Sequence, residues 1–109
     1  MNTPDKLTLL RRLKRLLQDH FHKTIKEVIL FGSRAAGTAR EDSDYDVLIV
    51  LNGEYDWKLR DEIIDLVYDL ELEYEVLFDK YLISTDELEH SLRGAQPIFK
   101  NAVKHGVYA

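Results

Sequence analysis

The chain has 109 residues, of which 45% are hydrophobic and 32% are charged, and its formal net charge is −5. A chain of this length is expected to form one domain, residues 1–109, that buries roughly two thirds of the surface its unfolded form exposes. No apolar run approaches the roughly 18 residues of a membrane span, and the N-terminus lacks the features of a secretory signal. The sequence contains no cysteine, which excludes disulfides and thiolate chemistry and suits a reducing cytoplasm.

The charge is distributed unevenly along the chain. Residues 1–40 carry nine Lys or Arg against three Asp or Glu, whereas residues 41–109 carry six against seventeen. An acidic chain is a poor general binder of nucleic acid, because non-specific affinity comes from neutralising phosphates. A local basic face on the first predicted helix leaves two interpretations open, a solvated surface or a contact with RNA or an acidic partner. Its residues are Arg11, Arg12, Lys14 and Arg15.

Hydrophobic periodicity and capping residues predict alternating helices and strands. In chain order they are a helix over about 4–21, a strand over 25–31, a short helical turn near 34–37, a strand over 44–51, a helix over 57–71, a strand over 74–83, a short helix to about 92 and a helix over 97–105. Thr3 and Pro4 offer a cap and a proline at the start of the first helix. Asp56 can cap the second long helix, and Ser84 with Glu87 has the spacing of a capping box.

Two acids stand at the start of a predicted strand whose other residues are apolar. Because strand side chains alternate, Asp44 and Asp46 point to the same face, with Cα atoms about 7 Å apart. Burying two such carboxylates without compensation is costly, and a divalent cation removes that cost. Oxygen ligands without His or Cys favour Mg²⁺ or Mn²⁺, and Mg²⁺ typically combines a few carboxylates with substrate phosphates.

A glycine and a serine follow the strand over 25–31. Gly32 and Ser33, at the start of a helical turn, are suited to present backbone N–H groups and a hydroxyl to an anion such as phosphate. Alone, a Gly-Ser pair is typical of a plain turn and an Asp-x-Asp pair of a solvated strand end. Their joint occurrence at this spacing indicates a phosphorylated substrate.

The segment GSRAAGTAREDSDYDVLIV resembles the signature of the DNA polymerase β-like nucleotidyltransferases, and most closely that of their minimal nucleotidyltransferase branch. The segments FDKYLISTDELE and PIFKNAVKHGVYA resemble the third strand and the C-terminal helix of that family. The resemblance implies an α/β (α+β) fold with a small mixed sheet of about three to four strands flanked by helices. It covers most of the chain from about residue 25.

The resemblance also implies roles for individual residues. Gly32 and Ser33 would hold the nucleotide phosphates, assisted by Arg34, whose guanidinium suits bidentate contacts with phosphate. Asp44 and Asp46 would coordinate the metal ions. Arg40 is interpreted as an exposed loop residue. The four histidines lack the spacing of metal ligands and are interpreted as surface residues: His20, His22, His90 and His105.

The resemblance implies a third carboxylate, which would coordinate mainly the metal that activates the nucleophile and act as a general base. This sequence offers two candidates for it. Glu75 and Asp79 are four residues apart in the strand predicted over 74–83, hence on one strand face but about 13 Å distant, so that only one can join the site. Asp79 is preferred, because it precedes the apolar end of the strand and the following cap. Lys80 and Tyr81 depart from the family pattern, which is usually apolar there, and Glu75 therefore stays as the alternative.

The family resemblance implies transfer of a nucleoside monophosphate, with AMP from ATP preferred, to a hydroxyl group. The acceptor expected for the minimal branch is a tyrosine of a separate helical HEPN protein in a toxin–antitoxin pair. The competing hypothesis is a non-catalytic module that binds a nucleotide or a partner and acts by contact. The sequence also leaves open a homodimer.

Overall fold

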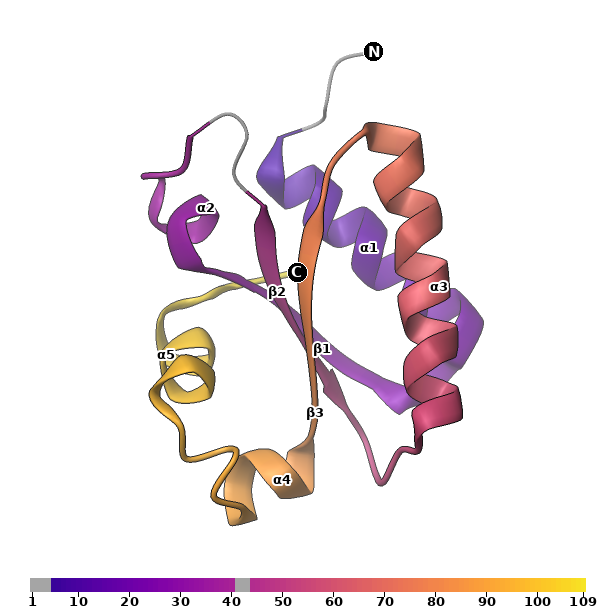
Figure 1. Cartoon of the computed structure of the whole chain (residues 1–109), viewed down its shortest axis with the longest axis vertical. Coiled ribbons are helices and arrows are strands. Elements are labelled where there is room, and N and C mark those ends of the chain that lie inside the picture. Colours follow the sequence, from indigo (N-terminus) through magenta and orange to yellow (C-terminus); the bar gives the residue numbers. More distant parts are fainter. Residues whose placement is uncertain (1–4, 41–43) are drawn as a thin grey trace.

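We describe residues 5–40 and 44–109 in a computed structural model of the chain (Figure 1). In chain order the elements are α1 (Lys6–Phe21), η1 (His22–Thr24), β1 (Ile25–Phe31), α2 (Gly32–Ala36), β2 (Tyr45–Leu51), α3 (Trp57–Tyr74), β3 (Phe78–Ser84), α4 (Thr85–His90), α5 (Pro97–His105) and β4 (Val107–Tyr108). In these ranges no helix is long and apolar enough to cross a membrane.

The four strands form one mixed sheet in the order β3-β2-β1-β4. Strand β1 is antiparallel to both β2 and β4, whereas β2 and β3 are parallel and are joined by the crossover helix α3. The expected α/β fold with three to four strands flanked by helices is therefore confirmed. Strand β4, of only two residues, was not predicted from the sequence.

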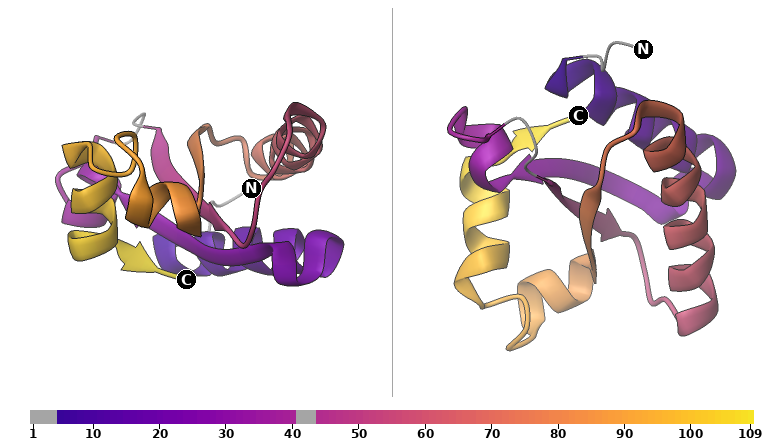
Figure 2. Two further views of the ribbon diagram at one scale, coloured as in Figure 1. Left: turned by 90° about the horizontal axis from the view of Figure 1, so that it is seen from below. Right: turned by 45° about the horizontal axis from the view of Figure 1, so that its top comes forward.

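Helices α1 and α3 cover one face of the sheet (Figure 2). Their leucines, isoleucine and valine pack against every second residue of the central strands, as strand alternation requires. The fully buried members from the two helices are Leu9, Leu13, Leu17, Ile63 and Val67. This larger core fixes the position of the sheet under the two long helices.

Helices α4 and α5 lie on the opposite face, where a smaller core forms (Figures 1 and 2). Phe99 and Ala102 of α5 pack there against Ile29, Leu48 and Ile83 from three neighbouring strands. Phe31 and Tyr81 pack against the end of this core from β1 and β3. The predicted site residues belong to that end.

The helix boundaries depart from expectation at the N-terminus. Helix α1 begins at Lys6 and is capped by Asp5, whose carboxylate accepts a hydrogen bond of 2.9 Å from the Thr8 N–H. The expected cap at Thr3 and Pro4 lies outside the described residues. The capping box predicted at Ser84 is confirmed, although α4 ends at His90 rather than near residue 92.

The strand predicted over 74–83 is wrong in its first half. Helix α3 continues to Tyr74, Glu75 adopts a left-handed conformation at its C-cap, and β3 begins only at Phe78. The helix continues because its buried face extends through Glu71 to Tyr74, which packs against the larger core. Glu75 therefore does not share a strand with Asp79, and the geometric comparison between them no longer applies.

A buried glutamate joins the end of α3 to β3. Glu71 is only 6% exposed, accepts a hydrogen bond of 2.8 Å from the Phe78 N–H and pairs with the Lys80 ammonium at 2.9 Å. Lys80, which departs from the family pattern, thus compensates a carboxylate that would otherwise be buried without a partner. Lys80 therefore departs from the family pattern for a structural reason, its pair with Glu71, and its presence is not an argument against Asp79 as the candidate for the third carboxylate.

We expect Glu71→Ala to destabilise the protein by about 2 kcal/mol, because the Phe78 N–H and the largely buried Lys80 ammonium would lose their acceptor. Urea denaturation followed by circular dichroism measures the change. Glu73→Ala is the matched control on the same helix. Its pair with Arg12 spans 3.8 Å between half-exposed side chains and should contribute less than about 0.5 kcal/mol. Equal losses in both variants would contradict this account.

Candidate active site

Three strands have a terminus at the same end of the sheet. Strand β1 ends at Phe31 where β2 begins, and Phe31 is the register partner of Asp46. Asp46 is in turn the register partner of Asp79 in the parallel pair of β2 and β3. The topology therefore brings the Gly-Ser turn and two aspartates from separate parts of the chain to adjacent positions.

The two aspartates lie on the sheet face that carries α5. Because every second residue of a strand points to the same face, Asp46 shares its face with Leu48 and Val50, which pack in the smaller core. Asp79 shares that face with Tyr81 in the same way. The last residue of β1 points to this face too, since Phe31 packs against the same core. The carboxylates consequently point into the region between the end of β1 and the C-terminal helix.

The environment of Asp46 disfavours its charged form. Burial raises the pKa of Asp46 above its ordinary value of 3.8, and the carboxyl groups of Asp79 and Asp44 raise it further by electrostatic repulsion. A hydrogen bond that protonated Asp46 donates to Asp79 adds to the effect. Asp44, just before β2, is exposed but near enough to contribute. The structure thus brings together all three predicted aspartates, and their accumulated charge is of the kind that a cation relieves.

Gly32 lies directly against the Asp46 carboxylate. A Cβ atom added at Gly32 would stand 2.3 Å from Oδ2 of Asp46, far inside van der Waals contact. Gly32 also has φ +72°, a left-handed conformation that side chains other than glycine rarely adopt. Both the backbone conformation and the carboxylate therefore require glycine at this position.

Ser33 and Arg34 occupy the first turn of α2. Ser33 is partly buried, and Phe31 at the N-cap position offers no side-chain acceptor to the turn. The Arg34 guanidinium lies 4.3 Å from the centre of the Tyr45 ring, and Lys6 donates a hydrogen bond of 3.1 Å to the Arg34 carbonyl. Contacts of Ser33 and Arg34 with a nucleotide stay predictions.

The donor set fits a magnesium ion that is shared with a substrate. Among residues 5–40 and 44–109, no three acidic or imidazole side chains are close enough to enclose a metal on their own. Asp44, Asp46 and Asp79 instead lie near the starts of β2 and β3, and their carboxylates offer only oxygen ligands. Mg²⁺ commonly completes such a partial set with phosphate oxygens and water.

The other charged candidates lie elsewhere. Glu75 ends α3 outside the sheet, and Arg40 is exposed in the segment after α2. Two residues of the basic face of α1 pair with acids of this protein: Arg12 with Glu73 at 3.8 Å and Lys14 with Glu27 at 3.7 Å. These pairs reduce the positive charge that this helix offers to RNA.

One residue of the site was not recognised from the sequence. The Tyr81 hydroxyl donates a hydrogen bond of 3.1 Å to Oδ2 of Asp79. Burial raises the pKa of Tyr81 above 10.0, and its hydrogen bond to Asp79 raises it further, so that the hydroxyl keeps its proton at neutral pH. The i, i+2 spacing of Asp79 and Tyr81 on a strand was the signal that could have indicated this contact.

We expect Tyr81→Phe to lower nucleotidyl transfer by about three- to tenfold, because Asp79 would lose the donor that orients its carboxylate. The ring packing against Phe31 and Phe99 is retained in this variant. Initial rates with saturating ATP measure the effect. Tyr108→Phe, which removes a hydroxyl bonded to the Val103 carbonyl, is the control and should leave the rate unchanged. A Tyr81→Phe rate equal to that of the parent would show that Asp79 needs no such support.

A mixed sheet with Gly-Ser at the end of one strand and aspartates on the next two strands defines a nucleotidyltransferase fold. The sequence profile of the family described as nucleotidyltransferase domain matches residues 10–107. The chain therefore belongs to the nucleotidyltransferase domain family.

One relative agrees with this assignment, and one solved structure agrees with the fold. A protein of Methanocaldococcus jannaschii named as a protein adenylyltransferase is 38% identical over 72 residues, a match that spans 66% of each chain. The crystal structure of the toxin–antitoxin complex MntA–HpeT superposes on 90% of this chain and 69% of the matched chain, with a TM-score of 0.61 and 21% identity. That likeness supports the fold. A nucleotidyltransferase from Sulfolobus solfataricus is 19% identical, covers 98% and 87% of the two chains, and has a TM-score of 0.46.

Proposed function

We propose that this chain transfers AMP from Mg²⁺–ATP to a hydroxyl group of a protein. The observation that carries the proposal is the contact between Gly32 and the Asp46 carboxylate, with Asp79 in register beside Asp46. In a member of the nucleotidyltransferase family, this arrangement supports a site in which Gly32 and Ser33 would contact the phosphates directly beside the carboxylates that would hold the metal. The name of the Methanocaldococcus jannaschii relative supports a protein acceptor and adenylate as the group transferred.

In the proposed reaction the acceptor oxygen forms a bond to the α-phosphorus of ATP. The bond from that phosphorus to the bridging oxygen of the β-phosphate breaks, and pyrophosphate leaves with the electron pair. Bound Mg²⁺ would lower the pKa of the attacking hydroxyl and stabilise the leaving oxygens. Asp44, Asp46 and Asp79 would hold the metal ions, and Asp79 would also accept the hydroxyl proton. The hydrogen bond from the Tyr81 hydroxyl to Asp79 supports this role, because it would orient the carboxylate.

The proposed acceptor is a tyrosine of a separately encoded HEPN protein. The structural likeness to a chain of the MntA–HpeT toxin–antitoxin complex supports the existence of a partner protein, whereas the HEPN type and the acceptor tyrosine rest on the family resemblance. The partner would present its hydroxyl at the open edge of the sheet where the three aspartates lie. Transfer of radiolabel from α-labelled ATP onto the HEPN protein encoded beside this chain, localised to tyrosine by mass spectrometry, tests the assignment.

The nucleotide site itself is tested first by calorimetry, which requires no knowledge of the acceptor. We expect the parent chain to bind ATP only with Mg²⁺ or Mn²⁺, and Asp44→Asn/Asp46→Asn to lose the binding. Absence of binding with ATP, GTP, CTP and UTP would contradict the proposal. Under the alternative of a non-catalytic antitoxin, the double variant would still neutralise its partner, whereas an enzymatic antitoxin would lose that ability.

A further inference from the structure

A cavity of about 320 Å³ lies between α2 and α5, on the same sheet face as the aspartates. Its floor is formed by Phe31 and Gly32 at the end of β1, and its walls by Ala35 and Ala36 of α2 on one side and by α5 on the other. No part of the proposed transfer reaction described above uses this cavity. Its size is at the lower end of the range of small-molecule pockets.

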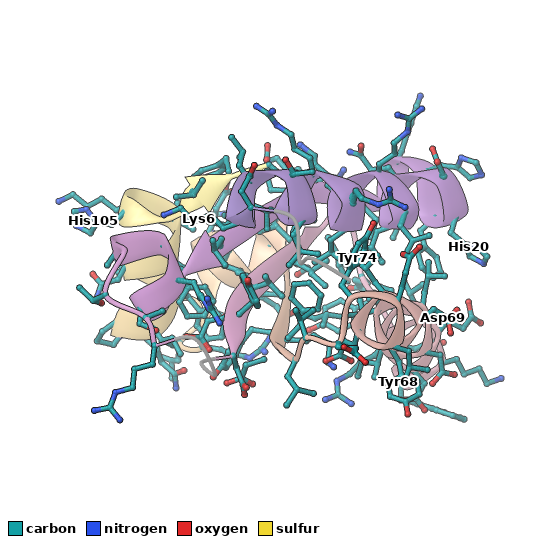
Figure 3. The ribbon with its side chains drawn as sticks, turned by 90° about the horizontal axis from the view of Figure 1, so that it is seen from above. Lys6, His20, Tyr68, Asp69, Tyr74 and His105 are labelled. Carbon is teal, nitrogen blue, oxygen red and sulfur yellow. The ribbon has the colours of Figure 1, made fainter. Side chains whose placement is uncertain are left out.

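Helix α5 presents one face to the cavity. Ile98, Asn101, Ala102 and His105 line it and recur at intervals of three and four residues, as positions on one side of a helix do. Ile98 is 39% exposed, which leaves an apolar side chain partly uncovered at the wall. Figure 3 shows His105 at the end of α5, on the side of the molecule where α2 lies.

The cavity adjoins the carboxylates through a single residue. Gly32 lines the cavity, and a Cβ added at Gly32 would also stand 2.3 Å from Oδ2 of Asp46. A ligand that reaches from the aspartates past Gly32 therefore enters the cavity next. A nucleoside triphosphate has this shape, because its phosphates and its base lie at opposite ends of one molecule.

The lining is suited to a flat, uncharged, aromatic group. Among the described residues that line the cavity there is no Asp, Glu, Lys or Arg, and His105 is the titratable side chain. The lining therefore offers no permanent charge to a phosphate or to a charged side chain. Small apolar side chains and the Phe31 ring offer surfaces against which a base can pack. The Asn101 side-chain amide supplies one acceptor and a donor group, the combination that pairs with the polar edge of a purine.

We propose that this cavity binds the purine base of the nucleotide, with Asn101 contacting the base edge and Ala36 forming part of the wall. The proposal rests on the function proposed above. It assigns base selection to the C-terminal helix α5 and the short helix α2, neither of which carries a catalytic aspartate.

Filling the cavity tests the proposal. We expect Ala36→Leu to weaken Mg²⁺–ATP binding by at least about tenfold, because the added side chain occupies the place of the base. Binding of tripolyphosphate, which has no base, should change by less than about twofold on the same scale. Ala95→Leu is the matched control, since Ala95 is exposed in the turn before α5 and does not line the cavity.

A second variant removes the polar contact without changing the packing of α2. We expect Asn101→Ala to weaken ATP binding by about fivefold and to lower the preference for ATP over UTP, because one hydrogen bond to the base is lost. Lys100→Ala, at an exposed position of α5 that does not line the cavity, is the control and should leave both values unchanged.

The outcomes separate the two proposals. If the parent binds ATP and Asp46→Asn abolishes the binding, but Ala36→Leu and Asn101→Ala bind ATP as the parent does, the cavity is not the base site and only this inference is overturned. If the parent binds tripolyphosphate and ATP equally tightly, the base makes no contact and the inference is likewise overturned. If the parent binds neither ligand with Mg²⁺, the proposed function fails together with the inference.

Discussion

Asp46→Asn is expected to reduce the proposed AMP transfer by at least about a thousandfold, because Asp46 is the central carboxylate between Gly32 and Asp79 and the proposed metal ion would lose a ligand. Initial rates with α-labelled ATP measure the loss. Mg²⁺–ATP binding should be lost in parallel in calorimetry. Asp69→Asn is the control, since Asp69 lies exposed on α3, on the opposite side of the molecule from α5 (Figure 3).

The same substitution is expected to stabilise the free protein at neutral pH. Burial raises the pKa of Asp46 above 3.8, so between that value and the folded-state pKa the folded protein binds more protons than the unfolded chain. Stability therefore falls as the pH rises through this window, and an uncharged Asn avoids the loss. Asp46→Asn should have the higher unfolding midpoint at pH 7, with the difference vanishing below about pH 3.8. A lower midpoint at pH 7 would show that Asp46 stabilises the fold and would make loss of activity uninformative.

Gly32→Ala is expected to lower transfer by about a hundredfold or more, because the new Cβ would stand 2.3 Å from Oδ2 of Asp46 and would displace either the carboxylate or the turn. The left-handed φ of +72° adds a backbone cost of about 1–2 kcal/mol to stability. Transfer rates and urea denaturation curves measure the two effects separately.

Gly37→Ala separates the contact from the backbone strain. Gly37 ends α2 with φ +77°, nearly the conformation of Gly32, but a Cβ there meets no atom within 4 Å among the described residues. We expect both variants to lose stability through their positive φ, with a further loss in Gly32→Ala from its contact with Asp46, whereas only Gly32→Ala loses most of the proposed transfer activity. Similar activity losses in both would mean that the conformation of the turn, rather than its contact with Asp46, determines the site.

Much of the architecture was predictable because it depends on local patterns. The apolar spacing in α1 and α3 and the capping box at Ser84 gave the helices within a few residues. The end of α3 was misjudged because Glu71 appears polar in the sequence yet is buried by its bonds to Phe78 and Lys80. Strand β4 was missed because two residues carry no periodic signal, and it forms only by pairing with Ile29 and Leu30 of β1.

The candidate site was predictable to the extent that it lies in one continuous segment. Gly32, Ser33, Asp44 and Asp46 fall within fifteen residues and together resemble a family signature. The third carboxylate lies on another strand, and the sequence left Asp79 and Glu75 as alternatives. Only the parallel register of β2 and β3 places Asp79 beside Asp46 and removes Glu75 from the sheet.

The sequence by itself determined the fold class, the family and the Gly-Ser and Asp-x-Asp residues, because local propensity and a contiguous motif depend only on the order of residues. The tertiary structure decided which carboxylate lies beside Asp46 and how closely Gly32 approaches it. It also decided that the Tyr81 hydroxyl bonds to Asp79 and that α2 and α5 flank a cavity beside the aspartates. These features join residues that are distant in the chain. They arise from strand register and from the packing of α5 against the sheet, which no local pattern specifies.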